Sequence, residues 1–329
     1  MILAIILFAL VSDFVTGFHD TANSIATSVL TRAISMRVAV FMAAGMNFLG
    51  GIVFVKVATT IAAKVVAPAA LAQVGQEVVL ATVIAAIIWN VITWRLGLPS
   101  SSTHALIGGL LGSAGLAIGV HNYSWAKLGQ VLIALIVSPV GGMIAGLLFV
   151  TLLMWIFRGM APLRTSNIFR KLQVGSASLM AFSHGANDAQ NSMGIITMAL
   201  LSAGFWPTPD KVKVLVPVRC LAAGAMGAGT AVGGWRIIKT LGRRMMQLKA
   251  IHGCAAETGG AVVVQICTHL GLPISTTHVI SSAIMGVGSA RRLSAVRWRV
   301  AGNIIAAWLL TFPATALLGA IGYKIMSLF

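Results

Sequence analysis

Two short polar motifs each occur twice in this chain, in the same order and within otherwise apolar sequence. The first reads Gly-Phe-His-Asp-Thr-Ala-Asn-Ser over 17–24, and its second copy, Gly-Ala-Asn-Asp-Ala-Gln-Asn-Ser, covers 185–192. The other reads Leu-Gly-Leu-Pro-Ser-Ser-Ser-Thr-His over 96–104 and recurs as Leu-Gly-Leu-Pro-Ile-Ser-Thr-Thr-His over 270–278. The copies begin 168 and 174 residues apart, so the pattern predicts two halves of one polar site.

The acids of the first motif could bind a cation or carry a proton. Asp20 and Asp188 occupy equivalent positions, and an asparagine, Asn23 or Asn191, follows each of them three residues later. A carboxylate at the bilayer centre costs about 2.5–3.5 kcal/mol on insertion scales, so its presence needs a reason. Residues three apart share a helix face, and an acid with an amide offers oxygen ligands to a small hard cation. The alternative is a structural hydrogen bond between helices, which the duplication disfavours.

The hydroxyl clusters of the second motif could bind an anion. If each cluster precedes a helix, its hydroxyls and backbone N–H groups lie at the positive end of a helix dipole. Simple N-capping after a proline turn is the alternative, and the two roles are compatible. The candidate oxyanion ligands are Ser101, Ser102, Thr103, Ser275, Thr276 and Thr277.

Four further residues of the motifs are additional candidates, namely Asn187, Gln190, His104 and His278. Each histidine could be a hydrogen-bonded structural residue or a proton relay. The roles of Arg95 and Glu257 stay open at this point.

The composition is that of a membrane protein. Of the 329 residues, 58% are hydrophobic and 9% are charged, and the mean hydropathy is +0.96. Soluble proteins carry about a quarter charged residues. The net charge of +17 does not indicate nucleic acid as a partner, because Lys and Arg lie in short loops between apolar segments. The sequence has no Walker motif, metal-ligand cluster or nucleophile–His–acid arrangement. We therefore expect no enzyme, no cofactor and no metal beyond a transported sodium ion.

The apolar sequence divides into ten segments, five on each side of a basic linker. We expect them over 1–30, 38–60, 78–95, 100–118, 129–157, 174–203, 212–235, 250–270, 275–290 and 300–326. An odd number per half inverts the second half, as in many secondary transporters. The predicted fold class is an all-α polytopic membrane protein. A first repeat covers 1–157, a cytoplasmic basic linker 158–173 and a second, inverted repeat 174–329, in one integrated transport domain.

The charges of the loops set the orientation. If the linker is cytoplasmic, the loops near 31–37, 236–249 and 291–299 share its side, and the loops near 61–77, 119–128 and 204–213 face the other side. The first group holds fifteen cations, namely Arg32, Arg37, Arg158, Arg164, Arg170, Lys171, Arg236, Lys239, Arg243, Arg244, Lys249, Arg291, Arg292, Arg297 and Arg299. The second group holds four, namely Lys64, Lys127, Lys211 and Lys213. By the positive-inside rule both termini then face outside.

Two local features leave alternatives open. The segments around each Gly-Leu-Pro motif could be two full crossings, or a re-entrant hairpin whose tip reaches the middle of the membrane. A tip of Ser and Thr without Lys or Arg favours the hairpin. The long first segment could be one tilted helix, or a helix interrupted near Gly17, and the glycine beside a buried acid favours the interruption.

At these motifs the chain resembles the inorganic phosphate transporter (PiT) family of secondary transporters. The family signature Gly-x-Asn-Asp-x-x-Asn matches 185–191 in full, whereas the first copy has His19 in place of the first asparagine. The resemblance covers nearly the whole chain. It implies symport of phosphate with sodium or protons, or transport of a metal–phosphate complex. It also implies an inverted-repeat core with two hairpins, and a homodimer.

We therefore expect cation-coupled symport of inorganic phosphate by alternating access, in the cytoplasmic (inner) membrane of a prokaryote. The hydroxyl clusters would bind phosphate, and the paired Asp and Asn residues would hold the coupling cation or carry protons. A sulfate permease of the same architecture is the first alternative. A passive anion channel is the second, and the paired acids argue against it because a channel needs no coupling.

Overall fold

The computed structural model describes residues 1–65, 75–205, 213–234, 237–238, 240, 245–290 and 292–328. Across these residues the chain forms helices and contains no strand. The α-helices are α1 (Ile2–Leu30), α2 (Met36–Val53), α3 (Lys56–Lys64), α5 (Gln76–Leu96), α6 (Ser102–Ile118), α7 (Trp125–Ile156), α8 (Pro162–Ser202), α9 (Val216–Val232), α11 (Ala250–Leu270), α12 (Thr276–Ser289) and α13 (Trp298–Met326).

Six of the described helices are long and apolar enough to cross a membrane, namely α1, α2, α5, α7, α11 and α13. The shorter helices α6 and α9 are also apolar. Large aliphatic side chains cover the outer faces of α7 and α13, where Ile136 is 69% exposed and Leu309 is 73% exposed. Such surfaces are stable in lipid and not in water. The chain is an integral membrane protein.

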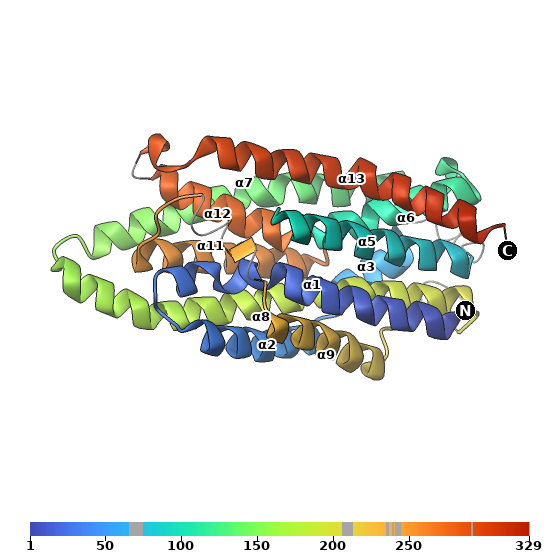
Figure 1. Ribbon diagram of the computed structural model, residues 1–329, viewed down its shortest axis with the longest axis horizontal. Coiled ribbons are helices and arrows are strands. Elements are labelled where there is room, and N and C mark those ends of the chain that lie inside the picture. Colours follow the sequence, from blue (N-terminus) through green and yellow to red (C-terminus); the bar gives the residue numbers. More distant parts are fainter. Residues whose placement is uncertain are drawn as a thin grey trace.

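The long helices lie side by side along the longest axis of the molecule (Figure 1). Both termini lie at one end of this bundle, and the connection between α7 and α8 lies at the opposite end. Helices that precede the α7–α8 connection pack against helices that follow it. α1 packs on α9, α2 on α8, α7 on α12 and α6 on α13. The two parts of the chain therefore pack directly against each other.

The two Gly-Leu-Pro motifs form the turns between α5 and α6 and between α11 and α12. Gly97 and Gly271 end the first helix of each pair with φ angles of 67° and 71°, which glycine adopts without strain. Ser101 and Ser275 then accept a hydrogen bond from the backbone N–H of the residue three positions on, which caps α6 and α12. The same local chemistry thus builds both turns.

The two helix pairs occupy opposite halves of the bundle. In Figure 1, α5 and α6 lie in the half nearest the termini, and α11 and α12 lie in the half nearest the α7–α8 connection. Their turns meet between them, since the rings of His104 and His278, one turn into α6 and α12, lie 4.4 Å apart.

One expected segment, 38–60, is not a single helix. The chain ends α2 at Val53 and begins α3 at Lys56. The side-chain oxygen of Gln190 on α8 accepts hydrogen bonds from the backbone N–H groups of Val57 (2.9 Å) and Ala58 (3.1 Å). It therefore caps α3 from a distant part of the chain, and nothing in the local sequence announces this break.

The expected interruption of the first segment near Gly17 is wrong, because α1 runs unbroken from Ile2 to Leu30. The motif glycines instead allow close helix packing. A Cβ atom on Gly17 would lie 2.2 Å from the carbonyl oxygen of Met226 on α9, and one on Gly185 would lie 2.1 Å from that of Asn47 on α2. Oxygen ligands therefore do not come from an unwound α1.

The basic linker expected over 158–173 is mostly helical, since α8 begins at Pro162 and continues to Ser202. Proline suits the first turn of a helix because the N–H it lacks has no partner there. Several of the loop cations lie outside the described residues, namely Lys211, Arg236, Lys239, Arg243, Arg244 and Arg291, as does the side chain of Lys64.

Candidate functional site

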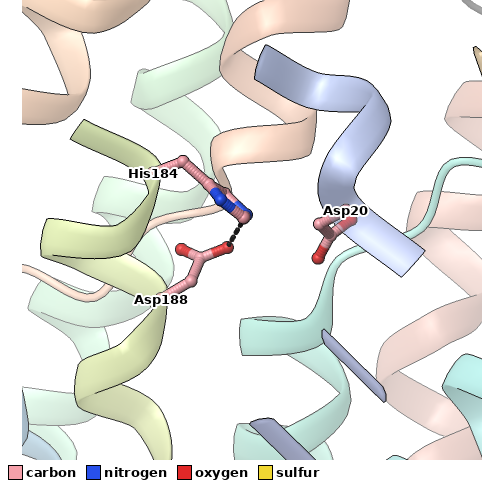
Figure 2. Close-up of side chains that lie close together, drawn as sticks. All are labelled: Asp20, His184 and Asp188. Carbon is pink, nitrogen blue, oxygen red and sulfur yellow. Dashed lines mark ion pairs between the residues drawn. The ribbon is translucent and has the colours of Figure 1, made fainter. Parts of the chain in front are cut away.

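The two acidic motifs lie opposite each other on α1 and α8, in the interior of the bundle. Asp20 is 1% exposed and Asp188 is 2% exposed. Figure 2 shows Asp20 on α1 facing Asp188 and His184 on α8. One ligand atom from each of these three residues lies within 4.8 Å of the others, which is a spacing that a bound cation could bridge.

Hydroxyl groups from both turns reach the Asp20 carboxylate. Its Oδ2 accepts a hydrogen bond from Ser102 Oγ (2.5 Å), and its Oδ1 accepts one from Thr277 Oγ1 (3.0 Å). The Nδ1 atom of His19 lies 2.9 Å from the same Oδ1. The turn of each helix pair is thus tied to α1 through a single carboxylate.

The Asp188 carboxylate has a similar but smaller set of partners. Its Oδ2 accepts a hydrogen bond from Thr276 Oγ1 (2.8 Å), which is the counterpart of Ser102 in the second motif copy. The Nε2 atom of His184 lies 3.2 Å from this oxygen. Each acid is therefore hydrogen-bonded by the turn of its own half and has one histidine beside it.

The two asparagines bind the turn of the opposite half. Asn23 donates to Thr277 Oγ1 (2.8 Å), and Asn191 donates to Thr103 Oγ1 (3.1 Å). Among the described residues, the Oδ1 atom of each asparagine is buried without a hydrogen-bond partner. An unpaired buried carbonyl oxygen costs about 1–3 kcal/mol unless a ligand satisfies it. Two such oxygens beside two carboxylates form a donor set that suits a hard cation.

The six candidate hydroxyls divide into two groups. Ser101 and Ser275 cap α6 and α12, whereas the other four contact the buried Asp and Asn side chains, namely Ser102, Thr103, Thr276 and Thr277. Because both helices begin here, their positive dipole ends and free backbone N–H groups point to the same region. The candidate cation ligands and the candidate anion ligands therefore lie side by side.

His19 and His184 are site residues that the motif comparison missed. Neither has a histidine at the matching position of the other copy, which is why the sequence assigned them no role. Asn47 Oδ1 lies 3.0 Å from His184 Nδ1, and the amide nitrogen of Asn47 donates to Thr230 (2.9 Å). Since a carbonyl oxygen only accepts, His184 carries its proton on Nδ1. Its Nε2 can then hold a second proton beside Asp188 or offer a lone pair to a cation. The spacing of four residues between His184 and Asp188 was the available signal.

Asn187 and Gln190 have positioning contacts. The Asn187 amide nitrogen lies 3.2 Å from both Asp188 Oδ1 and the carbonyl oxygen of Ile274, and its oxygen accepts from Thr268 (3.0 Å). Asn187 therefore connects the acid to the α11–α12 pair. Gln190 caps α3, as described above, and does not reach the carboxylates directly.

The rings of His104 and His278 pack on each other and on aromatic side chains of α13. The ring of His278 stacks on Trp308 of α13 at 3.9 Å. The indole N–H of Trp308 donates to the carbonyl oxygen of Pro99 (3.1 Å), so this contact ties α13 to the first turn.

The two residues of open role lie outside the carboxylate cluster. Arg95 is exposed on the last turn of α5. Glu257 is buried on α11 and accepts hydrogen bonds from Thr27, from Ser176 and from the Gln173 amide (3.2 Å). It anchors α11 to α1 and α8.

Comparison of the sequence with known proteins identifies the family of the chain. Residues 16–319 match the sequence profile described as "Phosphate transporter family". A probable low-affinity inorganic phosphate transporter of Bacillus subtilis is 43% identical over 98% of this chain and 96% of its own length. One from Rhizobium meliloti is 44% identical over the same shares of the two chains.

A solved structure agrees with these matches. The structure described as "The sodium-dependent phosphate transporter" superimposes with a TM-score of 0.91 at 26% identity, over 100% of this chain and 99% of that one. The relatives are transporters and not enzymes. Together with the buried site between interleaved membrane helices, these matches show that the chain belongs to the phosphate transporter family.

Proposed function

We propose that this protein is a symporter that couples the uptake of inorganic phosphate to a cation gradient by alternating access. The observation that carries the proposal is the position of Asn23 and Asn191. Their unpaired Oδ1 atoms lie on the same helices as Asp20 and Asp188, while their amide groups hold the hydroxyl turns. A cation bound by these oxygens would thereby act on the groups that bind the anion.

Sodium is the coupling cation that the site suits best. Carboxylate and amide oxygens are hard ligands, and the similar solved structure is described as sodium-dependent. Asp20, Asn23, Asp188 and Asn191 would supply the ligands. Protons carried on the acids and on His184 are the alternative, and a metal–phosphate complex is another form in which phosphate could enter.

The oxyanion would lie against the four hydroxyls that do not cap a helix, namely Ser102, Thr103, Thr276 and Thr277. The N-termini of α6 and α12 add positive dipole ends there. Two carboxylates would repel phosphate if they stood alone. Bound cations neutralise them, so binding of the anion would require binding of the cation first. This order is the physical basis of coupling.

Alternating access would follow from an inverted repeat with two re-entrant hairpins, α5–α6 and α11–α12. Three matched features support this architecture. In both halves the acid is hydrogen-bonded by the turn of its own half, and the asparagine donates to the turn of the other half. The two helix pairs lie in opposite halves of the bundle (Figure 1). The long helices α7 and α13 carry internal prolines, Pro139 and Pro313, that are 174 residues apart. Prolines inside helices produce kinks.

In the cell we place this symporter in the cytoplasmic (inner) membrane of a bacterium, with both termini outside and as a homodimer surrounded by lipid. The bacterial relatives and the predominance of cations in the loops on the linker side support this placement.

Uptake into proteoliposomes tests the coupling. The purified protein should accumulate radiolabelled phosphate against the phosphate gradient when an inward sodium gradient is imposed. It should not do so when the sodium gradient is absent. Asp20→Asn and Asp188→Asn should each abolish this uphill uptake, because each removes a negative charge that the cation neutralises. Glu77→Gln, which removes an acid at the start of α5, should leave uptake unchanged. Uphill uptake by both aspartate variants would contradict the proposal.

A further inference from the structure

A cavity lies at the end of the bundle opposite the termini, away from the paired aspartates. Its volume is about 820 Å³, and it lies where α1 and α7 end and where α8 and α11 begin. Four of its lining residues are cationic, and none is acidic; the cations are Arg32, Arg158, Arg170 and Lys249. None of these four forms an ion pair with a carboxylate of the described residues. The cavity therefore concentrates positive charge that the protein itself does not balance.

Arg32 holds its place in the cavity at a cost in backbone energy. It follows α1 with a φ of 58°, and it is the one residue other than glycine with a positive φ in the described part of the chain. The N–H of Ala33 bonds to the carbonyl oxygen of Ser28 (2.9 Å), and the N–H of Arg32 bonds to that of Val29 (3.2 Å). These two bonds form the helix ending in which glycine is usual at the position of Arg32. An arginine at this position indicates that its side chain has a use.

The cavity also has an apolar side. Leu30, Met154, Phe157 and Ile251 contribute to its lining. Beside it, Trp155 is 65% exposed at the end of α7, and the Arg158 guanidinium lies 5.9 Å from the centre of its ring. Tryptophan and arginine in this arrangement are typical of the membrane–water interface. The cavity can therefore receive a polar anionic group and the first part of an apolar chain.

A polar path leads from the cavity toward the buried acids. Thr31 lines the cavity and donates to the side-chain oxygen of Gln173 (2.7 Å), and the Gln173 amide donates to Glu257 (3.2 Å). Thr27, which also donates to Glu257, lies on the same face of α1 as Asn23. These hydrogen bonds connect the lining of the cavity to the helix that carries Asp20 and Asn23.

We propose that this basic cavity is a second oxyanion site, which binds a phosphate group at the interface on the linker side. The phosphate group belongs either to the headgroup of an anionic phospholipid or to free inorganic phosphate. Basic pockets between membrane helices on this side are chemically suited to anionic headgroups. The positive-inside rule would account for cations in these loops, but it requires neither a cavity nor an arginine with a positive φ. This proposal does not rest on the coupling mechanism above.

Two binding measurements on the detergent-purified full chain test the proposal and separate the two sources. Native mass spectrometry reports retention of phosphatidylglycerol against phosphatidylcholine. Calorimetric titration of the lipid-free protein with inorganic phosphate reports whether a second site exists. The variants are Arg32→Gly, Arg158→Gln, Arg170→Gln and Lys249→Gln. The matched control is Lys127→Gln, which removes one cation from the other end of α7.

If a lipid is the source, the unmodified protein should retain phosphatidylglycerol preferentially, and each cavity variant should weaken this retention by about fivefold. If free phosphate is the source, the titration should show a second binding event that Arg32→Gly removes while the first event persists. Arg32→Gly relieves the strained φ, so its thermal unfolding temperature should not fall, which separates lost binding from misfolding. Equal retention of both lipids together with a single phosphate site would overturn the proposal. Absence of the binding event that persists in Arg32→Gly would instead count against phosphate binding between Asp20 and Asp188.

Discussion

Asn23 on α1 donates a hydrogen bond to Thr277, the second residue of α12, across 254 positions of the chain. The same hydroxyl donates to Asp20 (3.0 Å), so one threonine joins the acid and the amide of the first motif to the turn of the other half. Asn191 of the second half likewise donates to Thr103 in the turn of the first half. The amide of each half thus holds a candidate anion ligand of the other half.

Replacing these amides should weaken binding of the coupling cation. Asn23→Ala and Asn191→Ala each remove a buried carbonyl oxygen and a hydrogen bond to a turn, and a lost partner of this kind is worth about 1–3 kcal/mol. We expect the sodium concentration for half-maximal phosphate uptake to rise roughly tenfold in each variant. Ser28→Ala is the matched control, because the Ser28 hydroxyl donates within α1 to Ile25 (3.1 Å). An unchanged sodium dependence in both asparagine variants would exclude these amides as cation ligands.

A second prediction concerns the motif glycines. Gly185→Ala should destabilise the fold, because its Cβ would lie 2.1 Å from the backbone oxygen of Asn47 on α2. Overpacking of this kind costs about 1–3 kcal/mol. Gly175→Ala lies on the same helix with no atom near its Cβ, so the gain in helix propensity should make it neutral or stabilising. Thermal unfolding measured in detergent should show a lower midpoint temperature for Gly185→Ala and not for Gly175→Ala. Equal midpoints would show that α2 and α8 can separate there without cost.

The sequence predicts those parts of the fold that depend on local chemistry. Apolar length predicted α1 over almost its full extent, and Gly-x-Pro followed by serine predicted turns that Gly97 and Ser101 then form. It did not foretell the break between α2 and α3, because the capping group, Gln190, lies 133 residues from Val57. The contact of His184 with Asp188 follows from their helical spacing of four residues, but His184 has no counterpart in the first motif copy, so duplication does not reveal it.

A third prediction concerns topology. Cysteines introduced at Ala295 and at Asn122 should react with impermeant reagents from opposite sides of the membrane, because the first lies on the linker side and the second near the termini. The reagent added outside should label Asn122→Cys and not Ala295→Cys in intact cells. Cys220 is exposed and must first be replaced by alanine. Labelling of Ala295→Cys from outside would reverse the orientation assigned from the loop charges.

The last prediction concerns the choice between phosphate and sulfate. Both anions can accept hydrogen bonds from hydroxyls and N–H groups, but near neutral pH only phosphate can also donate a proton. The Asp20 and Asp188 carboxylates are buried acceptors, and a lone pair of theirs that faces sulfate without a donor would cost about 1–3 kcal/mol, or roughly 10- to 100-fold in affinity. Phosphate and arsenate should therefore compete for uptake, whereas sulfate should compete poorly. Thr103→Ala and Thr277→Ala should raise the phosphate concentration for half-maximal uptake by roughly tenfold, since a hydroxyl bonded to a charged group is worth about 1.5–3 kcal/mol. Thr82→Ala removes a buried hydroxyl on α5 that donates to Val78 (2.8 Å) and contacts Ser113 on α6 (2.9 Å) but no residue of the motifs, and it should leave that concentration unchanged. If sulfate competes better than phosphate in the unmodified protein, the carboxylates do not accept a hydrogen bond from the substrate.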